Sequence, residues 1–213
     1  MGTVADWLVA IATLLVVVVA LRLHVLVYPP KLTLRLRSID GEATKVGVGM
    51  KQDDGTFVPT SIRDARYYHV ILSNERPIIL ANDVDVYIVS LETEDASGHY
   101  AEMWSGSLPL VATHYEVHPN RALGADPRAY DLCSIVRDKW LQLHPRIVPN
   151  NFPDRTRIGE GKIKYRVTLQ ARSQEVVSPR FAFELAWDGQ WDEDTVNMRR
   201  HMVVREPAGQ RVD

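Results

Sequence analysis

The sequence contains a single cysteine, Cys133, among its 213 residues, so no internal disulfide can form. Small secreted domains held together by disulfides are therefore excluded, and a hydrophobic core has to stabilise the fold. Positive charge is not in excess either: the formal net charge of −2 gives no reason to expect nucleic-acid binding. Hydrophobic residues form 46% and charged residues 24% of the chain, proportions typical of a globular protein rather than a disordered one.

Catalytic and cofactor motifs are scarce. The chain has no Gly-x-Ser-x-Gly nucleophile elbow, no phosphate-binding glycine loop and no Cys-x-x-Cys pair. Cys133 lies between Leu132 and Ile135 in an apolar segment, where a cysteine is expected to be an inert core residue. No cofactor is predicted, and a non-enzymatic protein is the first expectation.

Long hydrophobic runs are absent except at residues 7–28. A helix of about 22 residues is roughly 33 Å long, enough to cross the hydrocarbon core of a bilayer. The preceding residues carry no lysine or arginine, and no small-residue cleavage site follows, which favours an uncleaved anchor over a signal peptide. Residues 1–30 are therefore predicted to be a transmembrane anchor that contacts the lipid bilayer, with Trp7 and Tyr28 at its ends and Arg22 reaching the headgroups.

The basic residues beside this segment predict its orientation. Lys31, Arg35 and Arg37 follow it, and none precedes it. The positive-inside rule then places a single-pass protein in the cell membrane with its C-terminal domain in the cytoplasm. The inverted, periplasmic orientation is the alternative.

The rest of the chain is predicted to form strands. Residues 31–37 and 163–171 alternate between apolar and polar side chains, as half-buried strands do. Further strands are expected at residues 67–73, 84–91, 107–118, 132–136, 141–148, 181–185 and 202–205, with a hairpin turn at 53–55 and a helical turn at 192–200 capped by Asp194. Strands at this spacing, without amphipathic helices between them, predict a mainly β fold, an antiparallel β-sandwich over residues 31–205 with a flexible tail at 206–213.

Two of these strands resemble a known kind of module. Residues 68–74, Tyr-His-Val-Ile-Leu-Ser-Asn, are followed by Ala81 and by Val-Asp-Val-Tyr-Ile at residues 84–88. This pattern is similar to two paired strands of bacterial immunoglobulin-like modules, although the glycine usual after the asparagine is missing. Such modules sit behind a single transmembrane helix in many uncharacterised bacterial proteins. The resemblance covers about 20 residues, implies an immunoglobulin-like sandwich and implies no activity.

One candidate metal site lies in the strand predicted at residues 107–118. His114, Glu116 and His118 occupy positions i, i+2 and i+4, so their side chains share one face of a strand. Two imidazoles and a carboxylate suit zinc, and three protein ligands with one water form the usual catalytic arrangement. The alternative is a solvated polar edge.

The segment Trp187-Asp188-Gly189-Gln190-Trp191 is a candidate binding site. Asp-Gly predicts a tight turn, and a tryptophan flanks it on each side. Trp187, Asp188 and Trp191 are predicted to contact a partner or a sugar ring if the indole rings are exposed. In the alternative, both rings cap the end of the sandwich core.

An acidic run follows this turn. With Asp188, residues Asp192, Glu193 and Asp194 form an acidic cluster, and Arg199, Arg200 and His201 follow closely. Neutralisation by the neighbouring arginines is expected rather than calcium binding or glycoside hydrolysis.

The sequence therefore predicts a membrane-anchored, non-enzymatic module that binds another protein or a component of the cell envelope. The predicted contact surfaces are the turn between Trp187 and Trp191 and a sheet edge open to strand addition. One alternative is a membrane-tethered metal-dependent hydrolase centred on His114, Glu116 and His118. Another is a periplasmic domain that binds glycans through Trp187 and Trp191.

Overall fold

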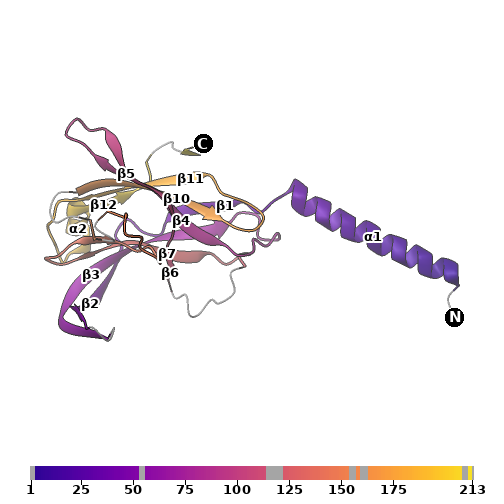
Figure 1. The fold of residues 1–213 in the computed structure, drawn as a ribbon, viewed down its shortest axis with the longest axis horizontal. Helices are drawn as coiled ribbons and strands as arrows, with labels where there is room; N and C mark the ends of the chain where they lie inside the picture. The colour runs from indigo at the N-terminus through magenta and orange to yellow at the C-terminus, as the bar shows by residue number, and fades with distance from the viewer. Residues whose placement is uncertain are drawn as a thin grey trace.

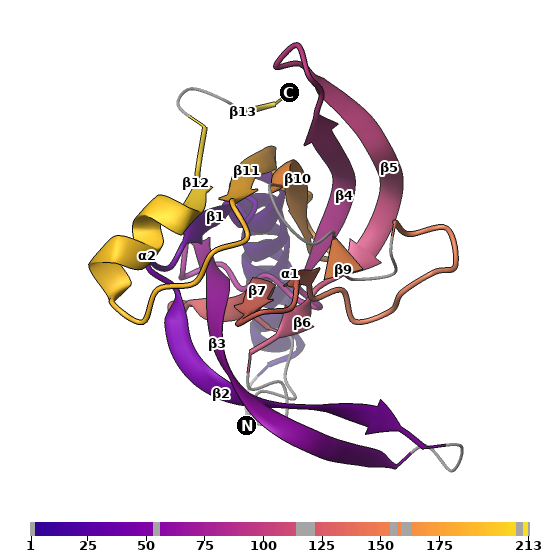
Figure 2. The ribbon, with the colours of Figure 1, turned by 90° about the vertical axis from the view of Figure 1, so that its left-hand side faces the viewer.

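The computed structural model describes residues 3–52, 56–113, 122–153, 157–158, 163–207 and 211–212. Within these residues the strands form two antiparallel sheets, one of seven and one of six strands (Figure 1, Figure 2). The seven-stranded sheet contains, in order, β1 (Leu32–Leu36), β3 (Phe57–Asn74), β7 (Arg128–Val136), β8 (Leu141–Leu143) and β9 (Arg157–Ile158), with β2 (Glu42–Lys51) on β3 and β6 (Val111–Ala112) on β7. The six-stranded sheet contains, in order, β12 (Met202–Arg205), β11 (Arg180–Trp187), β10 (Ile163–Arg172), β4 (Asp85–Glu94) and β5 (Tyr100–Pro109), with β13 (Arg211–Val212) on β11.

The two sheets share one hydrophobic core. In β10, Ile163, Tyr165, Val167, Leu169 and Ala171 face inward, as the predicted alternation of residues 163–171 requires. Tyr68 and Leu132 from one sheet are fully buried, as are Val167 and Phe183 from the other. Each such side chain contributes roughly 1.5–3 kcal/mol by leaving water, so this shared core is what holds the sheets together.

The mainly β, two-sheet fold predicted from the sequence is confirmed, with differences at particular strands. The hairpin predicted around residues 53–55 is present as the β2–β3 pair, in which Gln52 N donates to Thr56 O at 2.8 Å; residues 53–55 themselves lie outside the described residues. The strand expected at residues 107–118 differs most, because β5 begins at Tyr100 and ends at Pro109. Part of the predicted flexible tail, residues 211–212, forms β13 and pairs with β11.

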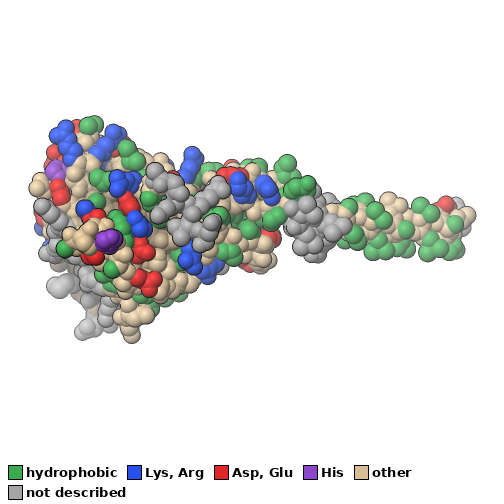
Figure 3. Space-filling model, turned by 90° about the horizontal axis from the view of Figure 1, so that it is seen from above, with side chains coloured by type: hydrophobic (Ala, Val, Ile, Leu, Met, Phe, Trp, Pro, Cys, Tyr) green, Lys and Arg blue, Asp and Glu red, His purple; other side chains and the backbone are tan. Residues whose placement is uncertain are grey.

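The transmembrane prediction is corrected. The N-terminal helix α1 (Val4–Val27) extends away from the β domain, and its described side chains are almost all hydrophobic and exposed (Figure 1, Figure 3). Among the described residues, no helix combines the length and the apolar character needed to cross a bilayer, so the transmembrane helix predicted at residues 7–28 is wrong.

The three residues predicted to contact lipid are placed as follows. Trp7 is 68% exposed in the first part of α1. The side chain of Arg22 lies outside the described residues. Tyr28 follows the helix, and the guanidinium of Arg76 lies 5.9 Å from the centre of its ring. The predicted membrane location and cytoplasmic side stay predictions.

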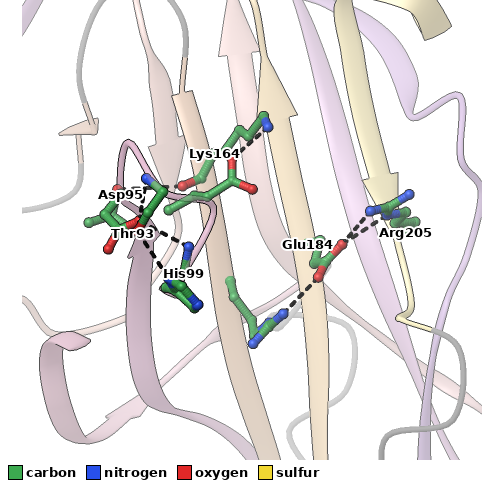
Figure 4. A network of polar contacts seen from close by, with 9 residues as sticks. Thr93, Asp95, His99, Lys164, Glu184 and Arg205 are labelled. Carbon is green, nitrogen blue, oxygen red and sulfur yellow. Dashed lines mark hydrogen bonds and ion pairs between the residues drawn. The ribbon is translucent and has the colours of Figure 1, made fainter. Parts of the chain in front are cut away.

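The outward face of the six-stranded sheet carries charged residues that pair with one another (Figure 4). Glu184 accepts from Arg166 at 3.0 Å and from Arg205 at 2.9 Å. Burial raises the pKa of Glu184, but the hydrogen bonds from both arginines outweigh it and hold the pKa below its ordinary value. The guanidinium of Arg166 also lies 3.8 Å from the ring centre of Tyr100. Glu184, Arg166 and Arg205 therefore neutralise one another on this face.

Candidate functional site

The candidate site is built around a two-stranded arm that projects from the seven-stranded sheet. β2 runs antiparallel to β3 along its whole length. β7 pairs with β3 only from Ala65 onward, and β1 only from Val70 onward. Within the described residues, positions 57–64 of β3 therefore pair with β2 alone, except that Asp64 O also accepts from Arg137 N at 2.9 Å. Together with residues 45–51 they form the arm, which curves away from the sheet (Figure 2).

Glycine allows the two strands of the arm to lie close together. The register shifts between Val48 and Gly49, and a Cβ atom at Gly49 would lie 1.9 Å from the carbonyl oxygen of Val58. Any side chain at position 49 would push the strands apart, so glycine is required there. Ile62, on the second strand of the arm, is 73% exposed, so the arm also presents apolar surface.

The outer edge of β2 has no partner strand in the part of the chain that the structure describes. Its residues 46–49, Val-Gly-Val-Gly, carry no charge, and Lys45 and Lys51 are the first charged residues on either side. Edge strands are normally protected by charge, proline or a covering segment. The middle of β2 lacks charge and proline, so it presents a row of backbone donors and acceptors suited to pairing with another chain.

A hollow of about 160 Å³, the outer hollow, lies between the arm and the outward face of β7 and β8. Its lining comes from β2 on one side and from β3, β7, β8 and the β7–β8 turn on the other. These residues are Val46, Gly47, Val48, Gly49, Tyr67, Ser134, Val136, Trp140, Gln142 and His144.

Three polar side chains at the floor of the outer hollow contact one another. The rings of Tyr67 and His144 stack, with centroids 5.2 Å apart. His144 Nε2 lies 2.9 Å from Ser134 Oγ, within hydrogen-bond distance. Burial lowers the pKa of His144, although the charge of Asp131 opposes the shift, so the neutral imidazole is favoured. Burial and the charge of Asp131 raise the pKa of Tyr67, and a hydrogen bond with Ser134 opposes this shift.

A second polar group extends this floor along β3 and β7. His69, which is 6% exposed, places Nδ1 2.9 Å from Asp131 Oδ1. Thr113 donates to the same carboxylate oxygen. Burial raises the pKa of Asp131, but these hydrogen bonds and the charge of His69 outweigh it, so the pKa lies below its ordinary value. Glu42, the first residue of β2, is the last member of this group, and its Oε2 lies 3.5 Å from His69 Nε2.

The chemistry of this floor is structural rather than catalytic. A serine beside a histidine is the start of a nucleophile–base pair, which needs an accessible hydroxyl and a carboxylate that orients the imidazole. Ser134 is 2% exposed, and the Asp131 carboxylate is hydrogen-bonded to His69 instead of His144. The polar side chains therefore fix the positions of β3, β7 and β8 under the arm.

A hollow of about 390 Å³, the end hollow, lies where β2 and β3 meet the segment before helix α2 (Thr195–His201). Its lining combines two alanines with six polar or aromatic residues. These residues are Ala43, Thr44, Lys45, Asp64, Ala65, Arg66, Trp191 and Glu193. Arg66 is only 3% exposed, so a charged group is buried at this end of the sandwich.

The predicted binding residue Trp187 lies in the core. It is 3% exposed, and its Nε1 donates to the carbonyl oxygen of Gln190 at 3.0 Å. The interpretation that the turn caps the core is confirmed for this residue, because a ring closed off in this way offers no face for stacking on a sugar. Trp191 packs against the same core but is only partly buried and lines the end hollow.

Asp188 is separated from Trp191 by the turn. It accepts from Gln190 N at 2.9 Å, and His201 Nδ1 lies 2.8 Å from its other oxygen. Burial raises the pKa of Asp188, but hydrogen bonds from His201 and Gln190 outweigh it and lower the pKa. Asp188 and Trp187 line a third hollow, of about 340 Å³, so the three predicted binding residues do not converge on one site.

The predicted metal ligands His114, Glu116 and His118 lie outside the described residues. Across the residues that the structure does describe, no group of three or more His, Cys, Asp or Glu side chains is arranged to hold a metal ion. The metal site stays a prediction.

The acidic run before α2 is neutralised differently from the prediction. Asp194 caps α2, because its side chain accepts from the amides of Val196 and Asn197, both at 2.9 Å. Glu193 pairs with Arg137 at 2.9 Å. Arg199 pairs with Asp40, which lies 159 residues away in the sequence. Long-range contacts therefore supply the counter-charges that the sequence attributed to neighbours.

Cys133 is fully buried between the sheets. Burial raises the pKa of its thiol far above the ordinary value, so the thiolate is disfavoured at neutral pH. The interpretation of Cys133 as an inert core residue is confirmed.

Sequence reasoning missed Arg66 and the floor of the outer hollow. The alternation of β3 does indicate that Tyr67 and His69 face away from Tyr68 and the core. Their partners come from β7 and β8, however, and no local pattern in the sequence joins Tyr67 to His144.

Comparisons of the chain with protein families, with curated proteins and with solved structures find no match. The immunoglobulin-like resemblance stays a prediction, but the pairing it implied between residues 68–74 and 84–88 is wrong, because β3 and β4 lie in different sheets.

Proposed function

We propose that this protein is a non-enzymatic binding module that recognises an extended segment of another protein by adding it as a strand to the outer edge of β2. The observation that carries the proposal is the arm: residues 45–51 of β2 pair on one side only and project beyond the sheet. Main-chain hydrogen bonds to the edge would supply affinity, and the hollows beside the arm would receive alternate side chains.

The energetics of the arm support a partner. A two-stranded hairpin is marginally stable in water without further strands or a covering layer. Along residues 57–64, the edge of β3 that faces away from β2 has no partner strand among the described residues. The outer edge of β2 has none either. A strand added to β2 would convert this part of the arm into a three-stranded sheet.

The charges of β2 favour a different protein over a second copy of this chain. If two copies of β2 paired antiparallel about Val48, Lys45 of each would face Lys51 of the other. Like charges directly opposite each other destabilise a strand pair. A segment with uncharged, β-branched residues at its centre and acidic residues at both ends would complement β2.

The test is a selection from a random library of displayed peptides, followed by proline substitution of the edge. Successive residues of a strand direct their N–H groups to opposite edges, so one of Gly47→Pro and Val48→Pro removes a donor from the free edge and the other breaks the pairing with β3. Hydrogen exchange in β3 identifies the variant that keeps the hairpin. We expect acidic-flanked, β-branched peptides to be enriched and to lose binding to that variant.

Met103→Pro is the matched control. Met103 lies on β5, the edge strand of the other sheet, at a position without a register partner. Peptide binding should survive this substitution. Selected peptides that bind the β2 edge variant as well as the wild type, or a selection without enrichment, would refute the proposal.

A further inference from the structure

Arg66 is a buried cation without a described anionic partner. Its Nη1 donates to the carbonyl oxygen of Asp40 at 2.9 Å, and both terminal nitrogens lie 3.5 Å from Thr195 Oγ1. Its Nε has no hydrogen-bond partner, although this atom is buried. A buried guanidinium held only by neutral oxygens is unfavourable, and an anion that contacts it would offset the cost.

A second donor at the same place is also unsatisfied. The indole Nε1 of Trp191 is buried and has no hydrogen-bond partner. Trp191 and Arg66 both line the end hollow, the first from the segment before α2 and the second from β3. Buried donors are normally satisfied in a native protein, so two orphans beside one hollow point to an acceptor that fills it.

The carboxylates around the end hollow are already engaged. Asp64 Oδ2 and Glu193 Oε1 lie 3.5 Å and 2.9 Å from Nη1 of Arg137, outside the hollow. Lys45 lines the hollow as a further cation. Arg137 pairs with both carboxylates of the lining and lies 3.9 Å from Asp138, and the Asp40 carboxylate near Arg66 pairs with Arg199, so Lys45 and Arg66 are the cations of the lining that remain for an incoming anion.

We propose that the end hollow binds a carboxylate group, with Arg66 as its charged donor and the indole N–H of Trp191 as its neutral one. A planar carboxylate matches a guanidinium better than other anions do, because its two oxygens accept in the plane of the N–H groups. A hollow of about 390 Å³ accommodates a small organic acid or an acidic side chain of a bound peptide. This site does not depend on strand addition to β2.

The test is titration of the full chain with sodium acetate, followed through the ¹⁵N–¹H signal of the Trp191 indole, which a Trp191→Phe variant assigns. Sodium chloride at matched ionic strength serves as the reference. We expect a saturable shift of this signal with acetate and none with chloride. Arg66→Gln should weaken the apparent affinity about tenfold or more, because a charge-assisted hydrogen bond is lost.

Arg63→Gln is the matched control, since Arg63 lies on the same strand and pairs with Asp138 at the surface. It should leave the acetate affinity unchanged. If Arg66→Gln does not fold, Trp191→Phe tests the same site by calorimetric titration with acetate and should weaken binding. A linear shift, or equal binding by the wild type and these variants, would overturn the proposal.

A second arm of the experiment separates the two sources of the carboxylate. A peptide with blocked ends, one glutamate and β-branched neighbours is added to the acetate-saturated protein. Competition with acetate, together with slowed amide exchange in β2, identifies an acidic side chain of an added strand as the ligand. Acetate binding without peptide competition identifies a free small carboxylate. Both outcomes support the carboxylate site. Acetate binding tests this site even if no peptide adds to β2 as a strand.

Discussion

The ring of Tyr67 lies against the imidazole of His144, with the two planes 17° from parallel and the centroids 5.2 Å apart. The imidazole is also held at its edge, where Nε2 lies 2.9 Å from Ser134 Oγ. His144 is partly buried at the floor of the outer hollow, and this burial lowers its pKa. The folded state therefore favours the neutral form of this histidine.

This linkage predicts a pH dependence of stability. Since the pKa of His144 lies below its ordinary value of 6.5 in the folded protein, the unfolded chain takes up a proton at higher pH than the folded chain does. The free energy of unfolding should therefore fall as the pH drops below about 6.5. Urea unfolding at about pH 8 and about pH 5.5 should show a smaller loss of stability for His144→Gln than for the wild type.

His99→Gln serves as the control, because His99 is exposed in the β4–β5 turn. Its loss of stability between the two pH values should equal that of the wild type. Asp131 affects stability in a separate pH range. Its pKa lies below 3.8, so its contribution to the free energy of unfolding is lost only in stronger acid. An unchanged pH response in His144→Gln would contradict the prediction.

Trp187 and Trp7 are the first residues of two segments that the sequence predicts to be functional. Replacing them should change the free energy of unfolding by very different amounts. Trp187→Ala leaves a cavity in the core and removes the donor to Gln190, so the free energy of unfolding should fall by about 3–5 kcal/mol. Trp7→Ala changes an exposed ring on α1 and should alter it by less than about 0.5 kcal/mol. Urea unfolding monitored by circular dichroism measures both. A small effect at Trp187 would mean that the turn is a surface loop after all.

The N-cap of α2 offers a prediction of intermediate size. Asp194→Ala leaves the amides of Val196 and Asn197 without their acceptor, which should cost about 1 kcal/mol. Asp194→Asn keeps a side-chain oxygen at the same position and should restore most of the stability. Thermal unfolding of both variants tests this, and equal midpoints for alanine and asparagine would exclude the capping role.

Strands such as β10 and β4 were predictable because their signals are local, whereas no strand was predicted at β2. Alternation in residues 163–171 identifies β10 and its buried face, and β-branched content identifies β4. Asp194 was predictable as a cap for the same reason, since its contacts lie two and three residues away. Trp187 was harder, because a tryptophan beside a turn fits a core position and an exposed one equally well.

The candidate site was not predictable because its contacts are long-range. Arg66 meets Trp191 at the end hollow only after β3 and the segment before α2 are brought together. Arg137 neutralises Glu193 across 56 residues of sequence. The transmembrane prediction rested on the length and apolar composition of residues 7–28 alone, and no helix among the described residues meets the requirements for a span.

The arm can be tested independently of any ligand through Gly49. In Gly49→Ala the new Cβ would lie 1.9 Å from the carbonyl oxygen of Val58, so the two strands must separate at the register shift. Because residues 57–64 pair only with β2 among the described strands, this opening should stay within the arm. Amide exchange should accelerate at residues 45–51 and 57–64, while the amides of β10 and β11 keep their protection. Gly124→Ala is the control, because its Cβ would meet the flexible end of Leu80 at 3.1 Å and the carbonyl oxygen of Pro77 at an ordinary 3.8 Å. It should leave exchange in the arm unchanged. Loss of protection throughout both sheets in Gly49→Ala would show that the arm is part of the folding core, and strand addition at β2 would then have no separate element to stabilise.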